Sequence, residues 1–279
     1  MNPAASRPTL GVIIRFKNSA RTLPDVLAAL RRQTVQPDLI VGVDNQSTDH
    51  SVALMKSAGA QVFNWTEPYK HPRVLNFAVR HCPTDLVLIL SSHTVLNSPD
   101  AISQLVGTMS DPQTACASAR WDDDPFYSDA ITWSELKSKG LKFGSIYSNS
   151  MGIFRRRLWE SVPFDESVPT MEDSAWTLEQ LKRGHTCQRL KFDFSYQRSG
   201  NARYFIFAVV TFHLAHQHHL KVCWLGPKAT CCMLGKHLLR WALHPTKASD
   251  ELAGIQTHKG RLAAWLFWPL AYKIFKNDR

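Results

Sequence analysis

The chain has 279 residues, enough for one large domain or for one domain with a terminal extension. Lysine and arginine outnumber aspartate and glutamate by 33 to 23, and the net charge of +10 suits nucleic acid, anionic lipid or a sugar diphosphate as partner. No secretory signal or membrane-spanning run is expected, and the 6 scattered cysteines lack metal spacing, so we expect reduced thiols in a cytoplasmic protein.

The N-terminal third predicts strands that alternate with helices. Residues 10–14 form an apolar, β-branched run of strand length, and residues 38–43 form a second one. Between them, Thr22 and Asp25 form a Thr-x-x-Asp capping box for a helix. Strand, helix and strand in this order predict parallel strands with a right-handed crossover. The pattern continues to about residue 120, with helices near 51–55, 73–81 and 99–109 and strands at 61–64, 85–90 and 115–120.

Polar residues follow each of the first two predicted strands. They are Arg15, Lys17 and Asn18 after the first strand, and Asp44, Ser47 and Asp49 after the second. Ligands of parallel α/β sheets bind beyond the carboxyl ends of the strands. The two clusters therefore predict a nucleotide site at that edge.

These segments resemble the opening of the family-2 glycosyltransferases, which have the GT-A fold. The resemblance rests on residues 13–18, the helix that ends near Gln33, and residues 43–49. Most of the family has proline where this chain has Arg15. The Arg-x-Lys-Asn pattern of residues 15–18 resembles a bacterial subset of the family. The resemblance implies an α/β fold with a mostly parallel, Rossmann-like central sheet, and a nucleoside-diphosphate sugar as donor. In the family, the aspartate that matches Asp44 reads the nucleobase.

The resemblance places Ser91, Ser92 and His93 where the family has an Asp-x-Asp motif. That motif holds a divalent cation that neutralises the leaving diphosphate. Both aspartates are absent here, as in some family members that have Ser-x-His instead. His93 can ligate Mn²⁺, less readily Mg²⁺, through a ring nitrogen, or it can bind a phosphate without any cation. Both interpretations stay open, and so does the cofactor.

Two residues of the predicted helix 73–81 match a spacing that is common in the family. Arg73 would donate to a phosphate in forked geometry, and Asn76 would contact the nucleoside or the sugar. The alternative is a solvated helix start, which is what we expect for Lys70 and His71.

A second signature resembles the acceptor half of the family. It comprises a segment with Asn149, the Phe-Asp-Glu turn at 164–166 and the pair Glu172 and Asp173. In the family, the aspartate that matches Asp173 takes the proton from the attacking hydroxyl, and Glu172 would orient it or hold the acceptor. Direct displacement needs such a base, because an alcohol is a poor acid. The alternative is a helix N-terminus stabilised by two acids. Asn149 and Trp176 are predicted to contact the acceptor.

Three further features have less specific interpretations. Residues 122–124 are all aspartate and predict a solvated loop near the acceptor entrance rather than a metal site. Many relatives have a histidine near Gln197 that is missing here, so Arg198 or Arg203 would supply positive charge instead. The histidines between 213 and 219 predict a polar helix end rather than a metal site.

We divide the chain into a GT-A domain over 1–202 and a helical extension over 203–279. The domain has a nucleotide-sugar half at about 10–120 and an acceptor half at about 121–202. Aromatic and basic residues interleave in the extension, which suits the headgroup layer of an anionic membrane. Packing on the catalytic domain or on a dimer partner is the alternative.

Together these features predict an inverting glycosyltransferase of bacterial cell-surface polysaccharide biosynthesis, peripheral on the inner face of the membrane. Its acceptor would be a glycan or a lipid-linked glycan. One alternative is a degenerate protein that only binds the nucleotide sugar, which the missing aspartates favour. Another is a sugar-nucleotide nucleotidyltransferase, which needs a glycine-rich loop that residues 15–18 lack. Nucleic-acid binding is not expected, because no recognition motif is present. The sequence does not predict an oligomeric state.

Overall fold

The computed structural model describes residues 7–120, 126–142, 146–197 and 204–222. It divides the chain into two units. The first unit comprises Met1–Trp133, Ser145–Glu166 and Glu172–Arg198. The described parts of the second unit are residues 134–142, 167–171 and 204–222. The acidic loop 122–124, Arg198, Arg203 and the basic, aromatic tail lie outside the described residues, and the boundary at 202 stays a prediction.

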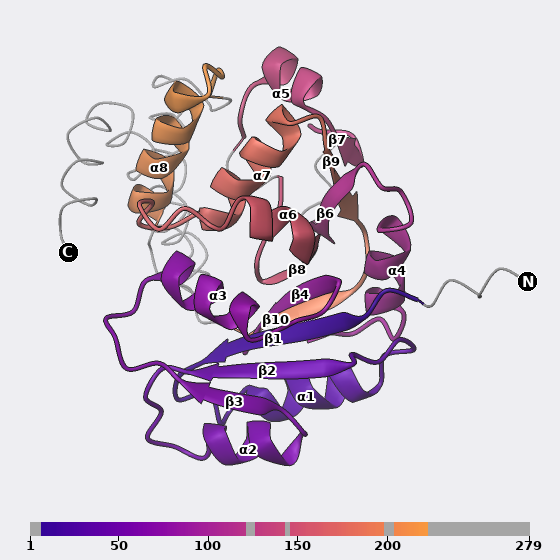
Figure 1. The fold of residues 1–279 in the computed structure, drawn as a ribbon, viewed down its shortest axis with the longest axis vertical. Helices are drawn as coiled ribbons and strands as arrows, with labels where there is room; N and C mark the ends of the chain where they lie inside the picture. The colour runs from indigo at the N-terminus through magenta and orange to yellow at the C-terminus, as the bar shows by residue number, and fades with distance from the viewer. Residues whose placement is uncertain (1–6, 121–125, 143–145, 198–203, 223–279) are drawn as a thin grey trace, which may run out of the picture. The chain divides into compact units, whose positions relative to one another are not determined.

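The first unit contains an eight-stranded sheet with the strand order β3-β2-β1-β4-β8-β6-β9-β7 (Figure 1). Its strands are β1 (Leu10–Phe16), β2 (Leu39–Asp44), β3 (Gln61–Asn64), β4 (Leu86–Ser91), β6 (Thr114–Ala119), β7 (Ala130–Ile131), β8 (Met151–Arg155) and β9 (Thr186–Leu190). Strands β1 to β4 are parallel to one another, β8 is antiparallel to both of its neighbours, and β9 is parallel to β6. The predicted α/β fold with a mostly parallel sheet is confirmed.

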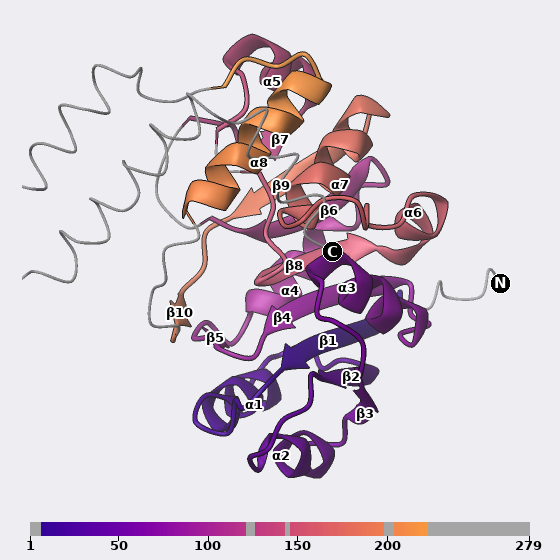
Figure 2. The same ribbon diagram turned by 90° about the vertical axis from the view of Figure 1, so that its left-hand side faces the viewer.

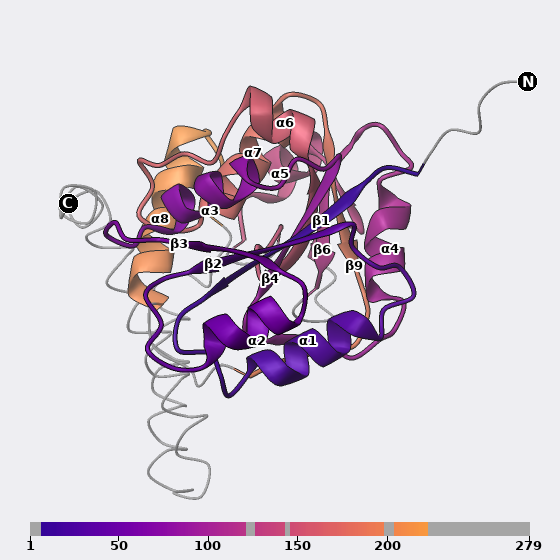
Figure 3. The same ribbon diagram turned by 60° about the horizontal axis from the view of Figure 1, so that its bottom comes forward.

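Helices of the first unit cover both faces of this sheet. They are α1 (Leu23–Arg31), α2 (Ser51–Ser57), α3 (His71–Arg80), α4 (Ala101–Thr108), α6 (Arg156–Ser161) and α7 (Glu172–Lys182). The second unit contains α8 (Tyr204–Gln217) and all of α5 (Trp133–Lys139) except its first residue. Figure 3 shows α1 and α2 on one face, with α3, α6 and α7 on the other. In the ranges that the structure describes, no helix is long and apolar enough to cross a bilayer.

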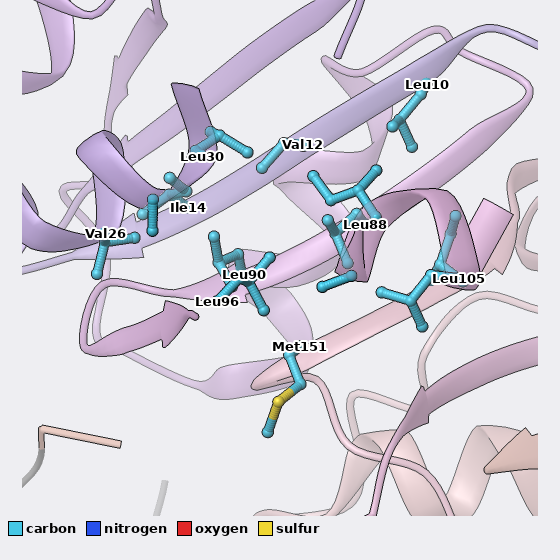
Figure 4. Close-up of a cluster of buried hydrophobic side chains, with 14 of the residues drawn as sticks. Leu10, Val12, Ile14, Val26, Leu30, Leu88, Leu90, Leu96, Leu105 and Met151 are labelled. Carbon is cyan, nitrogen blue, oxygen red and sulfur yellow. The ribbon is translucent and has the colours of Figure 1, made fainter. Parts of the chain in front are cut away.

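Alternation along β1 decides which of its side chains reach the site. Leu10, Val12 and Ile14 point into a hydrophobic core shared with α1 and α4 (Figure 4). Fully burying one such side chain contributes about 1.5–3 kcal/mol, and a slip of one residue would expose all of them. The register is therefore fixed. Ile13 and Arg15 consequently face the opposite side of the sheet, where α3 and α7 lie.

The predicted capping box at the start of α1 is wrong. Thr22 is the N-cap residue, but its side chain makes no cap hydrogen bond. Its hydroxyl donates instead to the backbone carbonyl of Ser92 at 2.6 Å, and Asp25 accepts from Gln197 Nε2 at 2.9 Å. Partners from distant parts of the chain have replaced the local ones. They connect the start of α1 to the loop after β4 and to the segment after β10.

The sequence did not predict the short strands β5 (Thr94–Leu96), β7 and β10 (Phe194–Tyr196). Figure 2 shows β10 beside β5, and the two form a separate antiparallel pair. This pairing brings residues almost a hundred positions apart to the end of β4. The helix predicted over 73–81 begins earlier, at His71, because Pro72 fits a first helical turn.

Candidate active site

Polar side chains join the loops that follow β1 and β2. The Asn18 N–H donates to Ser47 Oγ at 2.9 Å, and Asp49 accepts from the Ala20 N–H at 3.0 Å and from the Ser51 hydroxyl at 2.5 Å. The Ser51 hydroxyl is the main cause that holds the pKa of Asp49 below its usual value. Asn18, Ser47 and Asp49, predicted to bind the donor, are thus engaged in shaping the two loops.

Asp44 ends β2 and is buried at the edge of the sheet. Its carboxylate oxygens accept from the Ser47 N–H at 3.1 and 3.2 Å, which folds the loop back onto the strand. The register places Asp44 beside Phe16 at the end of β1, and Lys17 follows as an exposed residue. Each carboxylate oxygen has lone pairs for a second partner, so Asp44 keeps the capacity to accept from a nucleobase.

Ser91 ends β4 and Ser92 follows it, and both residues are buried. The Ser91 N–H donates to the Ser150 carbonyl at 2.9 Å, and the Ser92 hydroxyl pairs with the Ser19 hydroxyl at 3.1 Å. Ser91 also lies opposite Arg15 in the β1–β4 register. The end of β4 therefore connects the donor half to the segment that leads into β8.

His93 lies against the segment that contains β10. Its ring meets the Tyr196 ring edge to face, with centroids 4.6 Å apart, and its carbonyl accepts from the Gln197 N–H at 2.8 Å. The position near which many relatives carry a histidine is thus beside His93. Among the described residues, no three His, Cys, Asp or Glu side chains converge on a point. The His93 imidazole could offer a cation one ring nitrogen, and phosphate oxygens of a bound donor could supply further ligands.

Arg15 is held by Tyr69, in the loop before α3, and by His71, the first residue of α3. Its Nη1 donates to Tyr69 Oη at 2.8 Å and to His71 Nδ1 at 2.7 Å. Burial acts to lower the pKa of the guanidinium, but the Tyr69 phenol and the carboxylates of Glu172 and Asp173 outweigh it and raise that pKa. Arg15 is therefore a permanent positive charge that faces the acid pair.

Glu172 and Asp173 begin α7, and Asn149 binds both of them. The Asn149 N–H donates to Asp173 Oδ2 at 3.1 Å, and its Nδ2 donates to Glu172 Oε1 at 3.2 Å. Burial and the charge of Glu172 raise the pKa of Asp173 to about 7, against the opposing effects of the Asn149 and Ser174 N–H groups and of Arg15. A carboxylate with this pKa can exchange a proton near neutral pH. Asn149, predicted to contact the acceptor, here positions the acid pair.

Arg73 forms ion pairs with two carboxylates. Its Nη2 lies 2.8 Å from Glu67 Oε2, and its Nε lies 3.6 Å from Glu166 Oε2. The side chains are between 38% and 54% exposed, so each pair contributes little to stability. A phosphate would have to compete with these carboxylates for the guanidinium.

Asn76 and Trp176, predicted to contact donor and acceptor, both make hydrogen bonds inside the fold. Asn76 is buried, and its Nδ2 donates to the Phe164 carbonyl and to Glu166 Oε1, both at 2.9 Å. Its Oδ1 accepts from the Phe164 N–H at 3.1 Å and from Trp159 Nε1 at 3.0 Å. The amide is fully used inside the fold. Trp176 is buried in an aromatic cluster with Phe164, and its Nε1 donates to a backbone carbonyl at 2.7 Å.

Sequence reasoning missed Tyr69 and treated His71 as solvated. Both lie more than fifty positions from Arg15, and a single sequence carries no signal for that pairing. Tyr147 lies two residues before Asn149 in the same segment. It is buried, and burial, with the nearby Cys116 and Asp173, raises its pKa well above the usual value.

Parallel strands therefore end at an edge of nucleotide-binding type, and a helix from the later half of the chain begins there with a carboxylate of near-neutral pKa. This combination places the protein among the GT-A glycosyltransferases. The chain belongs to glycosyl transferase family 2, whose model matches residues 11–165.

Known relatives agree with this assignment. The O-antigen chain rhamnosyltransferase RfbN of Salmonella typhimurium is 27% identical over 192 residues, which span 62% of this chain and 61% of that relative's length. Two solved structures share the fold. The mannosyltransferase PcManGT from Pyrobaculum calidifontis, in complex with GDP-Man and Mn²⁺, has a TM-score of 0.65 at 17% identity, over 96% of this chain and 88% of its own. Glucosyl-3-phosphoglycerate synthase from Mycobacterium tuberculosis, with Mn²⁺ and UDP-glucose, has a TM-score of 0.59 at 16% identity, over 77% and 80%.

Proposed function

We propose that the protein is an inverting glycosyltransferase that moves a sugar from a nucleoside diphosphate to a hydroxyl of a glycan or lipid-linked glycan. The observation that carries the proposal is the placement of Asp173. Its carboxylate is held by Asn149, has a pKa of about 7 and faces Arg15 from the first strand. A base of this kind beside a nucleotide-type sheet edge is what an acceptor alcohol requires.

In the proposed reaction, Asp173 takes the proton of the acceptor hydroxyl. The hydroxyl oxygen then forms a bond to the anomeric carbon while the bond from that carbon to the diphosphate oxygen breaks. Attack from the face opposite the leaving group inverts the anomeric centre. Asp44 would accept from the nucleobase, and Arg73 would exchange its surface carboxylates for a phosphate of the donor.

A divalent cation would neutralise charge on the departing diphosphate. Its protein ligand in the described ranges would be the imidazole of His93, because serines stand at Ser91 and Ser92. Mn²⁺ suits an imidazole better than Mg²⁺ does. Complexes of the solved relatives with Mn²⁺ support testing this cation first.

Rhamnose is the first sugar to test, because RfbN is named as an O-antigen chain rhamnosyltransferase. The name also supports a role in cell-surface polysaccharide synthesis. We further propose that the protein works on the inner face of a bacterial membrane, held there by the basic and aromatic residues of its tail.

The test is a panel of dTDP-rhamnose, GDP-mannose and UDP-glucose, assayed for release of nucleoside diphosphate with Mn²⁺, with Mg²⁺ and with EDTA. Asp173→Asn should lower kcat by at least ~100-fold with little change in donor affinity, because removal of a general base costs about 10²–10⁴ in rate. Glu179→Gln is the matched control, since this carboxylate lies on the same helix in a surface pair with Arg183. Full turnover by Asp173→Asn would remove the assignment of the base. Donor binding without turnover by the wild type would favour a degenerate protein that only binds the nucleotide sugar.

A further inference from the structure

The three residues Arg15, Tyr69 and His71, which we name the Arg15 cluster, form a compact hydrogen-bonded group. Arg15 Nη1 carries two protons, and Tyr69 Oη at 2.8 Å and His71 Nδ1 at 2.7 Å take one each. The Tyr69 and His71 rings also meet edge to face, with centroids 5.1 Å apart and planes at 84°. Two acceptors on one nitrogen fix both the position and the rotation of the guanidinium plane.

The chain stiffens the loop that supplies these acceptors. Pro68 precedes Tyr69, and Pro72 follows His71 in the first turn of α3. Proline fixes its own φ and restricts the residue before it. The loop thus loses little further freedom when it holds Arg15.

The strand register brings Arg15 to the part of the sheet where the acid pair is held: Arg15 lies opposite Ser91, and the Ser91 N–H donates to the carbonyl of Ser150. The neighbouring Asn149 binds both Glu172 and Asp173. Glu172 and Asp173 both act on Arg15, and Arg15 in turn acts against the burial that raises the pKa of Asp173. The other groups that face Asp173 are the Glu172 carboxylate, the Tyr147 phenol and the N–H groups of Asn149 and Ser174. Among these groups, the Arg15 guanidinium supplies the positive charge.

We propose that Tyr69 and His71 are positioning residues for the acid pair: they fix the Arg15 guanidinium on the face of the sheet where α7 begins with Glu172 and Asp173, so that its positive charge acts on the base. This inference rests on the proposed function of Asp173.

The test is the pH dependence of kcat/KM for the full chain, with the donor that proves active in the panel. The acid limb of this pH profile is the part where activity rises as the base ionises. Arg15→Gln should move it to higher pH by about one unit, because loss of a neighbouring positive charge disfavours the carboxylate. Arg15→Lys should stay closer to the wild type, since it keeps the charge. Tyr69→Phe and His71→Gln should each move the limb in the same direction by a smaller amount. His81→Gln, at the other end of α3, is the matched control and should leave the limb in place.

A double-mutant cycle separates positioning from direct binding. In the Arg15→Gln background, Tyr69→Phe should produce no further shift, because the group that it positions is gone. Unmoved acid limbs in Tyr69→Phe and His71→Gln, with a raised KM for the donor, would overturn the inference and make the two residues donor ligands. The proposed function would survive that result. It fails separately if the wild type releases nucleoside diphosphate from no donor, or if Asp173→Asn retains activity. Thermal unfolding of each variant shows whether it is folded.

Discussion

At the scale of single residues, the environment that suits Asp173 to proton transfer should also weaken the fold. The pKa of its carboxyl rises from 3.8 to about 7 on folding, so the unfolded chain ionises first as the pH increases. The unfolded state then binds fewer protons than the folded state between pH 4 and 7, and stability falls over that interval. Above pH 7 the full destabilisation persists.

Asp173→Asn should remove this effect. We expect the variant to unfold at a higher temperature than the wild type above pH 7, and the difference to vanish below about pH 4, where both side chains are neutral. Melting curves across this pH range measure it. Glu179→Gln should follow the wild type at every pH. A difference between Asp173→Asn and wild type that is independent of pH would show that the carboxyl is not shifted.

Asn76 provides a second prediction at this scale, and it separates structure from binding. Asn76→Asp keeps the shape of the side chain but loses both donors, and it sets a carboxylate against the Phe164 carbonyl and Glu166. Leaving buried groups unsatisfied costs about 1–3 kcal/mol each, so we expect a loss of about 2–4 kcal/mol in unfolding free energy. Denaturant unfolding measures the loss. A stable variant with raised KM for the donor would return Asn76 to the binding site.

At the scale of elements, β8 has no room for a side chain at its second residue, Gly152. A Cβ on Gly152 would collide with the Ser148 carbonyl and with the Tyr147 ring. A backbone carbonyl cannot move aside cheaply, so Gly152→Ala should destabilise the fold by at least about 1–3 kcal/mol. Gly107→Ala is the matched control, since a Cβ there meets nothing within 4 Å, and in helix α4 it should stabilise by about 0.5–1 kcal/mol. Equal stability of the two variants would contradict the packing around β8.

The sequence could predict those elements whose signal is local, and it could not predict those that depend on distant partners. Strands such as β1 and β4 are predictable because burial on both faces leaves an apolar run, and this signal is local. Strands β5 and β10 are three residues long and depend on each other across the chain, so neither carries a pattern of its own. The prediction of a capping box at the start of α1 was wrong for a related reason. Thr22 and Asp25 have the right chemistry for a local box, but distant partners bind them instead.

The contacts of the candidate site likewise divide into local ones, which the sequence could predict, and long-range ones, which it could not. The acid pair was predictable, because adjacent acids at a helix start in a recognisable order of motifs are local features. The partners of Arg15 and of Asn76 were not, because each bond joins segments that only the folded sheet brings together. Residue type gave the correct chemistry for Asn76, an amide that makes several hydrogen bonds, but it did not show which groups the amide would bond.

At the scale of the whole molecule, the net charge of +10 bears on where the protein works. If the aromatic and basic tail binds the membrane surface, the full chain should sediment with vesicles that contain phosphatidylglycerol and not with neutral phosphatidylcholine vesicles. Each basic residue near an anionic surface contributes about 1 kcal/mol, and this attraction extends over about one Debye length.

The salt dependence of vesicle binding distinguishes electrostatic attraction from insertion of apolar side chains. At about 1 M salt the Debye length is about 3 Å, so binding that depends on charge alone should be lost, whereas inserted aromatic side chains should retain part of it. Glutamate substitutions at Lys273 and Lys276 should weaken binding at low salt, because they reverse two charges of the tail. The same substitutions at Lys137 and Lys139, which lie in α5, are the matched control. Equal losses from the two pairs would mean that net charge, and not the tail, brings the protein to the membrane.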